Sequence, residues 1–175
     1  IVSLCRGKDP DRAPKFFKAL KALKAKGIMG DLNDEPEQKK LITKEVEATI
    51  LDLLPVKHFD MIFSHSPAGE YTRHIRHEEI GKAVINLWHT NQIAANCLWA
   101  FAYDDGNKRY LPRSHENATI SNTLSKQIWE RKHKIITEIY GFDKDSWEAR
   151  TTPKTEAFWQ FKNPIAAFKW FKDME

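Results

Sequence analysis

Residues 61–79 read MIFSHSPAGEYTRHIRHEE, and they contain the densest group of chemically active side chains in the chain. The apolar run 61–63 has no polar alternation, which is typical of a strand buried on both faces. Beyond the polar loop that follows it, apolar residues spaced three and four apart predict a helix over about 77–89. A buried strand, a polar loop and a helix together make one unit of an α/β sheet.

The same alternation continues on both sides of this stretch. The predicted elements are a strand at 1–5, a helix at 14–26, a short apolar piece at 28–29, a helix at 42–54, a strand at 97–103, a helix at 117–139 and an aromatic-rich helix within 154–172. Strands that alternate with helices favour a parallel sheet. We therefore predict one α/β domain over residues 1–175 with a mostly parallel sheet, whose ligand site lies at the carboxyl ends of the strands.

Composition narrows the class of protein. The chain has 175 residues, of which 41% are hydrophobic and 30% charged, and these values suit one domain with a core. Its net charge is +4, but the basic residues are spread along the chain and no strand interleaves them with aromatics, so we expect no nucleic-acid partner. No apolar run approaches the roughly 20 residues that span a bilayer, so we expect no transmembrane segment.

The two cysteines, Cys5 and Cys97, both lie in apolar runs, and they form no CxxC pair. This pattern predicts two buried, reduced thiols rather than a thiolate metal site. Reduced thiols are typical of a reducing compartment, so we expect a cytoplasmic protein.

The histidines carry the most informative spacing. His74 and His77 lie three residues apart and face the same way if both are in a helical turn, and imidazole is a common zinc ligand. Two ligands do not complete a zinc site, so a solvated helix start remains an alternative. His65 is either an extra ligand, an outer-shell group or a histidine bonded to the backbone. Glu70 is one of several acidic residues that are typical of turns, and a glycosidase-like carboxylate pair among them is the alternative. No phosphate-binding loop or nucleophile elbow is present.

The stretch 61–79, with its His74-x-x-His77 pair, is similar to the second metal motif of the PIG-L/LmbE-like zinc-dependent N-deacetylases. Other segments agree with this family in order and spacing: CRGKDPDR at 5–12, MGDLND at 29–34, FAYDDG at 101–106 and YGF at 140–142. The resemblance covers most of the chain and is thin beyond about residue 150. It implies a Rossmann-like three-layer α/β domain.

The resemblance also implies an activity: removal of an acetyl group from an N-acetylated amino sugar or a related small amide, with one zinc ion. In that comparison His77 matches a zinc ligand and His74 the group that stabilises the oxyanion. Tyr71 resembles a tyrosine on the substrate side of the site. Arg6, Arg12 and Asp34 match loops that line the sugar pocket.

Two departures from the family pattern bear on activity. The family's His-Pro-Asp-Asp motif, which supplies two zinc ligands and the general base, is absent from these residues, and we expect it on a strand before Ile1. The family's acidic residue before the ligand histidine is Arg76 here. The alternative function is therefore a non-catalytic module of the same fold that binds a glycan or a sugar nucleotide.

The aromatic residues near the end of the chain have two possible roles. They can pack onto the sheet of their own domain, or they can form a contact in a homo-oligomer. These residues are Trp147, Phe158, Trp159, Phe161, Phe168, Trp170 and Phe171.

Overall fold

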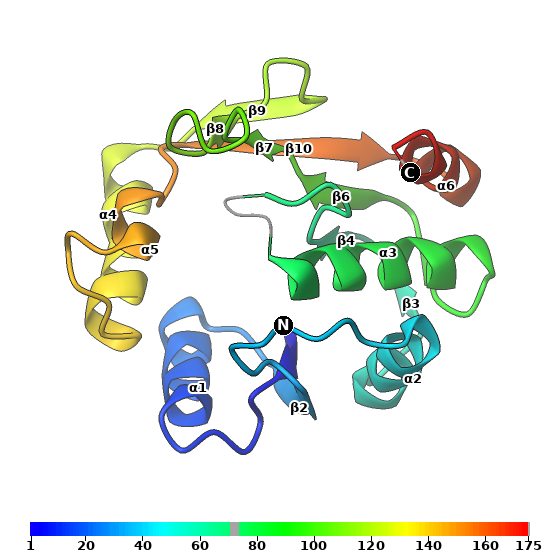
Figure 1. Ribbon diagram of the computed structural model, residues 1–175, viewed down its shortest axis with the longest axis horizontal. Helices are drawn as coiled ribbons and strands as arrows, with labels where there is room; N and C mark the ends of the chain where they lie inside the picture. Colours follow the sequence, from blue (N-terminus) through cyan, green and yellow to red (C-terminus); the bar gives the residue numbers. More distant parts are fainter. Residues whose placement is uncertain (71–73, 175) are drawn as a thin grey trace.

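The structure, a computed structural model, describes residues 1–70 and 74–174 as a mixed α/β arrangement (Figure 1). Its helices are α1 (Arg12–Leu23), α2 (Thr43–Leu53), α3 (Ile75–His89), α4 (Lys126–Lys134), the π-helix η1 (Ile135–Ile139), α5 (Trp147–Arg150) and α6 (Pro164–Lys172). Its strands are β1 (Val2–Cys5), β2 (Ile28–Leu32), β3 (His58–Phe59), β4 (Ile62–Ser64), β5 (Ala94–Ala95), β6 (Leu98–Phe101), β7 (Tyr103–Asp104), β8 (Arg113–Ser114), β9 (Ile120–Thr123) and β10 (Thr155–Phe161).

The largest sheet has four strands in the order β4-β6-β10-β9. β4 runs parallel to β6, but β10 runs antiparallel to both β6 and β9. Parallel pairing also joins β1 to β2 and β3 to β5, whereas β7 and β8 are antiparallel. The sheets are therefore mixed, and the expectation of a mostly parallel sheet was wrong.

The helix expected within 154–172 is instead a strand followed by a helix. The segment 155–161 reads TEAFWQF, and aromatic residues of this kind favour a pleated surface. The helix starts only at Pro164, and the side chain of Asn163 before it caps the helix by accepting a hydrogen bond from Ala166 N at 2.8 Å. The Asn-Pro pair was the signal that separates the two elements.

The long helix expected over 117–139 begins later than predicted. Residues 120–123 form β9 on the edge of the main sheet, and Ser125 then caps α4 by accepting a hydrogen bond from Ile128 N. The last turn before Tyr140 is the π-helix η1. The chain therefore adds an edge strand where periodicity indicated only a helix.

The main core lies between α3 and the four-stranded sheet. Leu87 on α3 and Leu98 on β6 are fully buried in one hydrophobic cluster, which also includes Val46 of α2. α6 packs along α3, where the rings of His89 and Phe168 stack with their centroids 4.0 Å apart. On the other side of the molecule α1, α4 and α5 gather together (Figure 1).

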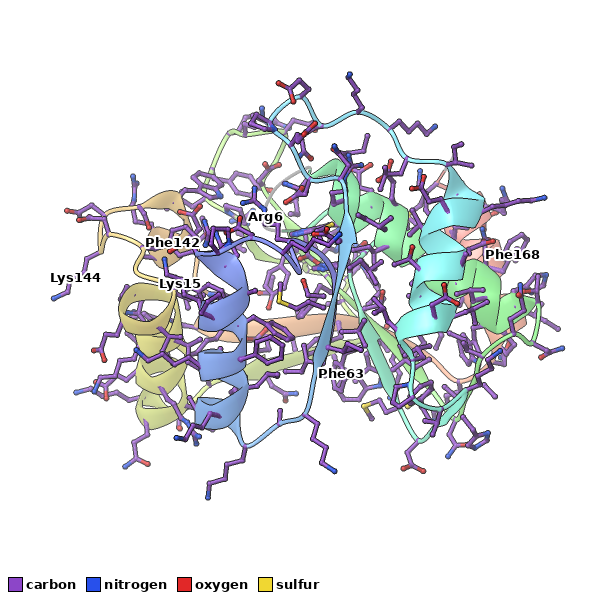
Figure 2. The ribbon with its side chains drawn as sticks, turned by 90° about the horizontal axis from the view of Figure 1, so that it is seen from below. Arg6, Lys15, Phe63, Phe142, Lys144 and Phe168 are labelled. Atoms are coloured by element: carbon purple, nitrogen blue, oxygen red, sulfur yellow. The ribbon has the colours of Figure 1, made fainter. Side chains whose placement is uncertain are left out.

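β1 and β4 each have one edge without a strand partner among the described residues. Both strands line the same cavity of about 1020 Å³, which Phe16 of α1 and Phe63 of β4 also border. Phe63 is 56% exposed. Phe142, which also borders the cavity, lies at another side of the molecule, beside α1 and near Lys15 (Figure 2). A gap in backbone pairing therefore divides the β1-β2 pair from the main sheet.

The aromatic residues near the end of the chain pack mostly onto their own domain. Trp159 of β10 lies against Trp170 of α6 with ring centroids 5.9 Å apart, and Phe171 is buried in the main core. Trp147, by contrast, is 42% exposed. Among the described residues, no helix is long and apolar enough to cross a membrane.

Both cysteines are free and half-buried. Burial in the wall of the cavity, together with the nearby charge of Asp34, raises the pKa of the Cys5 thiol from 9.0 to about 11. The reactive thiolate therefore dominates only above about pH 11, so at pH 8 the folded protein holds about 100-fold less Cys5 thiolate than an unperturbed cysteine would. We expect alkylation of Cys5 by iodoacetamide, followed by mass spectrometry in a Cys97→Ser variant, to accelerate about 100-fold on denaturation. Equal rates in the folded and denatured protein would contradict this assignment.

Candidate functional site

The loop after β4 is held tightly against α3. A side chain at Gly81 would lie 2.7 Å from both His65 O and Pro67 N, so only glycine lets the helix approach this loop. Ser66 is buried, and its hydroxyl accepts a hydrogen bond from Ala68 N, which shapes the turn. His65 at the end of β4 and the first turn of α3 are therefore brought to one place.

Glu70 and two histidines form the centre of this site. His65 Nδ1 lies 2.8 Å from Glu70 Oε1, and His77 Nδ1 lies 3.1 Å from the same oxygen. The two imidazoles are stacked, with centroids 3.9 Å apart and planes 7° apart. Potential ligand atoms of all three residues lie within 4.8 Å of one another, so the group could hold a metal ion.

The Glu70 side chain is only 2% exposed. Burial acts to raise its pKa, but the neighbouring His65 and His77 outweigh burial and lower the pKa to about 2. Glu70 is therefore an anion at neutral pH. Its Oε2 is buried and has no hydrogen-bond partner among the described residues, and the same holds for His77 Nδ1.

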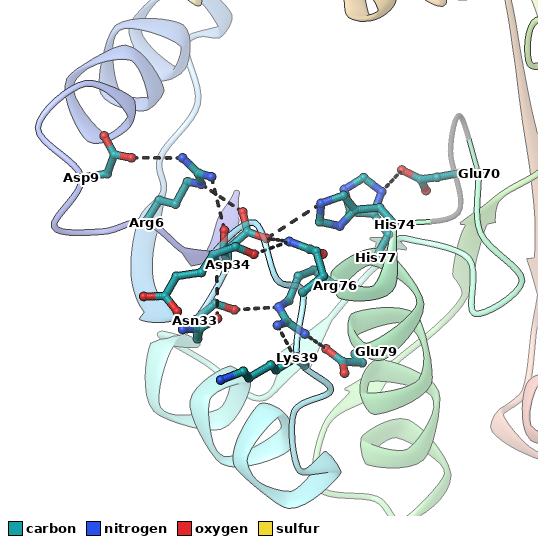
Figure 3. A network of polar contacts seen from close by, with 12 residues as sticks. Arg6, Asp9, Asn33, Asp34, Lys39, Glu70, His74, Arg76, His77 and Glu79 are labelled. Carbon is teal, nitrogen blue, oxygen red and sulfur yellow. Dashed lines mark hydrogen bonds and ion pairs between the residues drawn. The ribbon is translucent and has the colours of Figure 1, made fainter.

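His74 lies beside this group and faces a second acidic residue. Its ring centroid is 4.9 Å from that of His77, and its Nε2 is 3.8 Å from Asp34 Oδ1 (Figure 3). Burial, and then the nearby His77, lower the pKa of His74, so its imidazole is neutral near pH 7. Its Nδ1 is buried and has no hydrogen-bond partner among the described residues.

Arg6 fixes Asp34 in place. Arg6 Nε donates to Asp34 Oδ2 at 3.0 Å, and Arg6 Nη1 lies 3.2 Å from Asp9 Oδ2. Burial raises the pKa of Asp34, but hydrogen bonds from Gln38 and Arg6 outweigh it and lower the pKa below its usual value. Arg6 itself has a φ of 63°, a left-handed conformation that is uncommon for a residue other than glycine.

The structure brings most of the predicted site residues to one cavity. Of the residues singled out in the sequence, the cavity wall includes Arg6, Arg12, Asp34, His65, His74 and His77. Arg12 lies apart from the histidines, with its guanidinium 4.9 Å from the centre of the Phe142 ring. Tyr71 lies outside the described residues.

Arg76 does not take part in this cluster, although it stands between the two motif histidines. It is 3% exposed and its Nη1 donates to Glu79 Oε2 at 2.5 Å. Its other nitrogen atoms donate to the backbone oxygens of Asn33 and Lys39. Arg76 therefore ties α3 to the loop at 33–41, which includes Asp34.

Glu70 was missed as a site residue, because its sequence position suggested only an acidic turn. The signal that could have found it is local: it lies five residues after His65 and seven before His77. Comparisons with models of protein families, with curated proteins and with solved structures give no match for this chain. The case for function therefore depends on the geometry of the site and on the sequence resemblance.

Proposed function

We propose that this chain is the domain of a zinc-dependent hydrolase that removes an acetyl group from an N-acetylated amino sugar or a related small amide. The observation that supports this proposal is His77 at the wall of a large cavity, beside the buried Glu70 carboxylate, with His65 and His74 next to it. Histidine and carboxylate side chains around an open position are typical of catalytic zinc sites.

The residues present suit a divalent cation. Glu70 provides a buried negative charge, and the group includes buried polar atoms without hydrogen-bond partners among the described residues. In the proposal His77 is a zinc ligand. The resemblance assigns the remaining ligands and the general base to a His-Pro-Asp-Asp motif, which the 175 residues do not contain.

Bound zinc would polarise the acetyl carbonyl and make water a stronger nucleophile near neutral pH. His74 would donate a hydrogen bond to the carbonyl oxygen as negative charge develops on it, which is worth most in a site shielded from water. Arg6 and Asp34 would bind sugar hydroxyl groups, since both line the cavity and are held by each other. Arg12 would contact the more distant part of the substrate.

We also propose that the domain has a Rossmann-like three-layer architecture. The free edges of β1 and β4 border the same cavity, and both strands are apolar. One parallel strand between them would join β2-β1 to β4-β6-β10-β9 in a single sheet. This position agrees with the strand that the resemblance expects before Ile1.

The proposed function is tested by measuring acetate release from N-acetylglucosamine derivatives, with added zinc and with a chelator. The assay compares the 175 residues with a version that carries a His-Pro-Asp-Asp strand upstream. Zinc-dependent acetate release by the extended form supports the proposal. Metal-independent binding of the sugar without acetate release would instead support the glycan-binding alternative.

His74→Ala is expected to lower kcat by roughly 10²–10³, the usual cost of losing one oxyanion donor, in the form that is active. Zinc content is expected to stay unchanged, because His74 is not a ligand in this proposal. The measurement is steady-state kinetics together with metal analysis of the same samples. A normal kcat with full zinc occupancy would exclude this role for His74.

A further inference from the structure

We infer that Glu70 is a positioning residue, which keeps the proton of both His65 and His77 on Nδ1 so that His77 presents its unprotonated Nε2 to the cavity. This inference deepens the proposed function and rests on it for the identity of the ion. It concerns protons on residues of this chain, so it can be tested without any metal.

The proton between His65 and Glu70 lies on the histidine. Their nitrogen and oxygen atoms are 2.8 Å apart, which is a hydrogen-bond distance. An ionised carboxylate has no proton to donate, so the proton must be on His65 Nδ1. A neutral imidazole with a proton on Nδ1 has a free lone pair on Nε2.

His77 also directs its Nδ1 toward Glu70. Its Nδ1 lies 3.1 Å from Glu70 Oε1, within ion-pair distance, but makes no hydrogen bond among the described residues. Among the described residues, this nitrogen and Glu70 Oε2 are both buried without a partner. An N–H donor and a carboxylate acceptor complement each other. A buried unpaired polar group costs about 1–3 kcal/mol, which favours that pairing.

The position of the cavity decides which nitrogen a ligand meets. His65 and His77 line the cavity, whereas Glu70 is not among the described residues that do. Figure 3 shows Glu70 on the opposite side of the imidazoles from Asp34, which also lines the cavity. A ligand in the cavity therefore approaches the ring edges that face away from Glu70.

The stacking of the rings argues against Glu70 as a direct ligand together with both histidines. A metal ion binds an imidazole nitrogen close to the plane of the ring. The planes of His65 and His77 are only 7° apart with centroids 3.9 Å apart, so one ion cannot lie in both planes. His77 can bind an ion through Nε2 while His65 stacks against it and shares Glu70. A carboxylate behind a ligand histidine fixes its tautomer and raises its basicity.

The decisive experiment is ¹⁵N NMR of the imidazole nitrogens in the metal-free 175-residue protein at neutral pH. We expect His65 and His77 to be protonated on Nδ1, and Glu70→Ala to shift both rings toward a mixture of tautomers. Glu70→Gln, which keeps the shape of the side chain, is expected to shift them in the same direction if Glu70→Ala does not fold. Glu116→Ala, at an exposed acidic residue, is the matched control and should change neither ring.

Protonation of the wild-type rings on Nε2, or tautomers unchanged in both Glu70 variants, would overturn the inference. Zinc added to the form that carries the His-Pro-Asp-Asp strand upstream provides the second readout, in which the His77 Nε2 signal should move while the Nδ1 proton is retained. Loss of that proton on zinc binding would show that Nδ1 or Glu70 binds the ion, and would also overturn it. If zinc does not bind, the proposed function is weakened, but the metal-free tautomers still decide the role of Glu70.

Discussion

In the form that carries the His-Pro-Asp-Asp strand upstream, replacing His77 with alanine is expected to abolish measurable zinc binding and, with it, any deacetylase activity. In the proposal His77 is the one zinc ligand among the described residues, and its imidazole lies 3.1 Å from the buried Glu70 carboxylate. Loss of an outer-shell partner alone costs about 10–100-fold in metal affinity, and loss of a ligand costs more. The Kd for zinc is measured by competition with a chromophoric chelator, and zinc content by elemental analysis.

A matched control is available at His58, which is exposed on the short strand β3. His58→Ala removes one imidazole from the chain but leaves the site intact, so its zinc affinity should equal that of the wild type. Thermal unfolding of both variants without metal separates loss of a ligand from loss of the fold. Stoichiometric zinc in His77→Ala would remove His77 from the site and with it the central element of the proposed function.

Arg76→Ala is expected to lower the free energy of unfolding by about 3–5 kcal/mol, the cost of removing one partner of a buried ion pair. The reason is geometric: the substitution leaves the Glu79 carboxylate, whose side chain is 10% exposed, without its partner at 2.5 Å. It also removes the hydrogen bonds that Arg76 donates to the Asn33 and Lys39 carbonyl groups. The free energy of unfolding is measured by urea denaturation.

Two further variants identify the source of the loss. Arg76→Met combined with Glu79→Leu replaces the pair with apolar side chains and is expected to cost much less than Arg76→Ala, because no buried charge remains unpaired. Arg150→Ala, at an exposed arginine of α5, should stay within about 0.5 kcal/mol of the wild type. If Arg76→Ala behaves like Arg150→Ala, the network seen around α3 does not stabilise the fold.

Sequence patterns predicted most elements of the first hundred residues well, because turn and capping residues mark where each of them begins and ends. The helix expected at 42–54 is α2 at Thr43–Leu53, and the strand expected at 61–63 is β4 at Ile62–Ser64. The errors lay later in the chain: β9 forms where the start of a helix was expected, and the segment from 155 to 161 is a strand, although clustered aromatics suit either a buried helix or a strand. Pairing with β6 and β9, which are distant in sequence, makes it a strand, and local pattern alone does not contain that information.

The site shows the same division between local and distant information. The spacing of His74 and His77 predicted their proximity, and their rings indeed lie 4.9 Å apart. Glu70 was not recognised, because its role depends on how the loop folds back onto α3 at Gly81. Arg76 was read as a departure from a catalytic motif, but its side chain is a structural cross-link to the loop at 33–41. Neighbouring positions on one helix thus serve different purposes, and only their orientation separates them.

The gap in pairing between β1 and β4 also bears on how the molecule unfolds. Among the described residues, no backbone hydrogen-bond ladder crosses from the β1-β2 pair to the four-stranded sheet. Side chains join the two parts, through the packing of α2 against α3 and the hydrogen bonds of Arg76 to the loop at 33–41. Regions that share no ladder can open separately, at different free energies. The β1-β2 part and the four-stranded sheet are therefore expected to exchange their amide hydrogens with different protection.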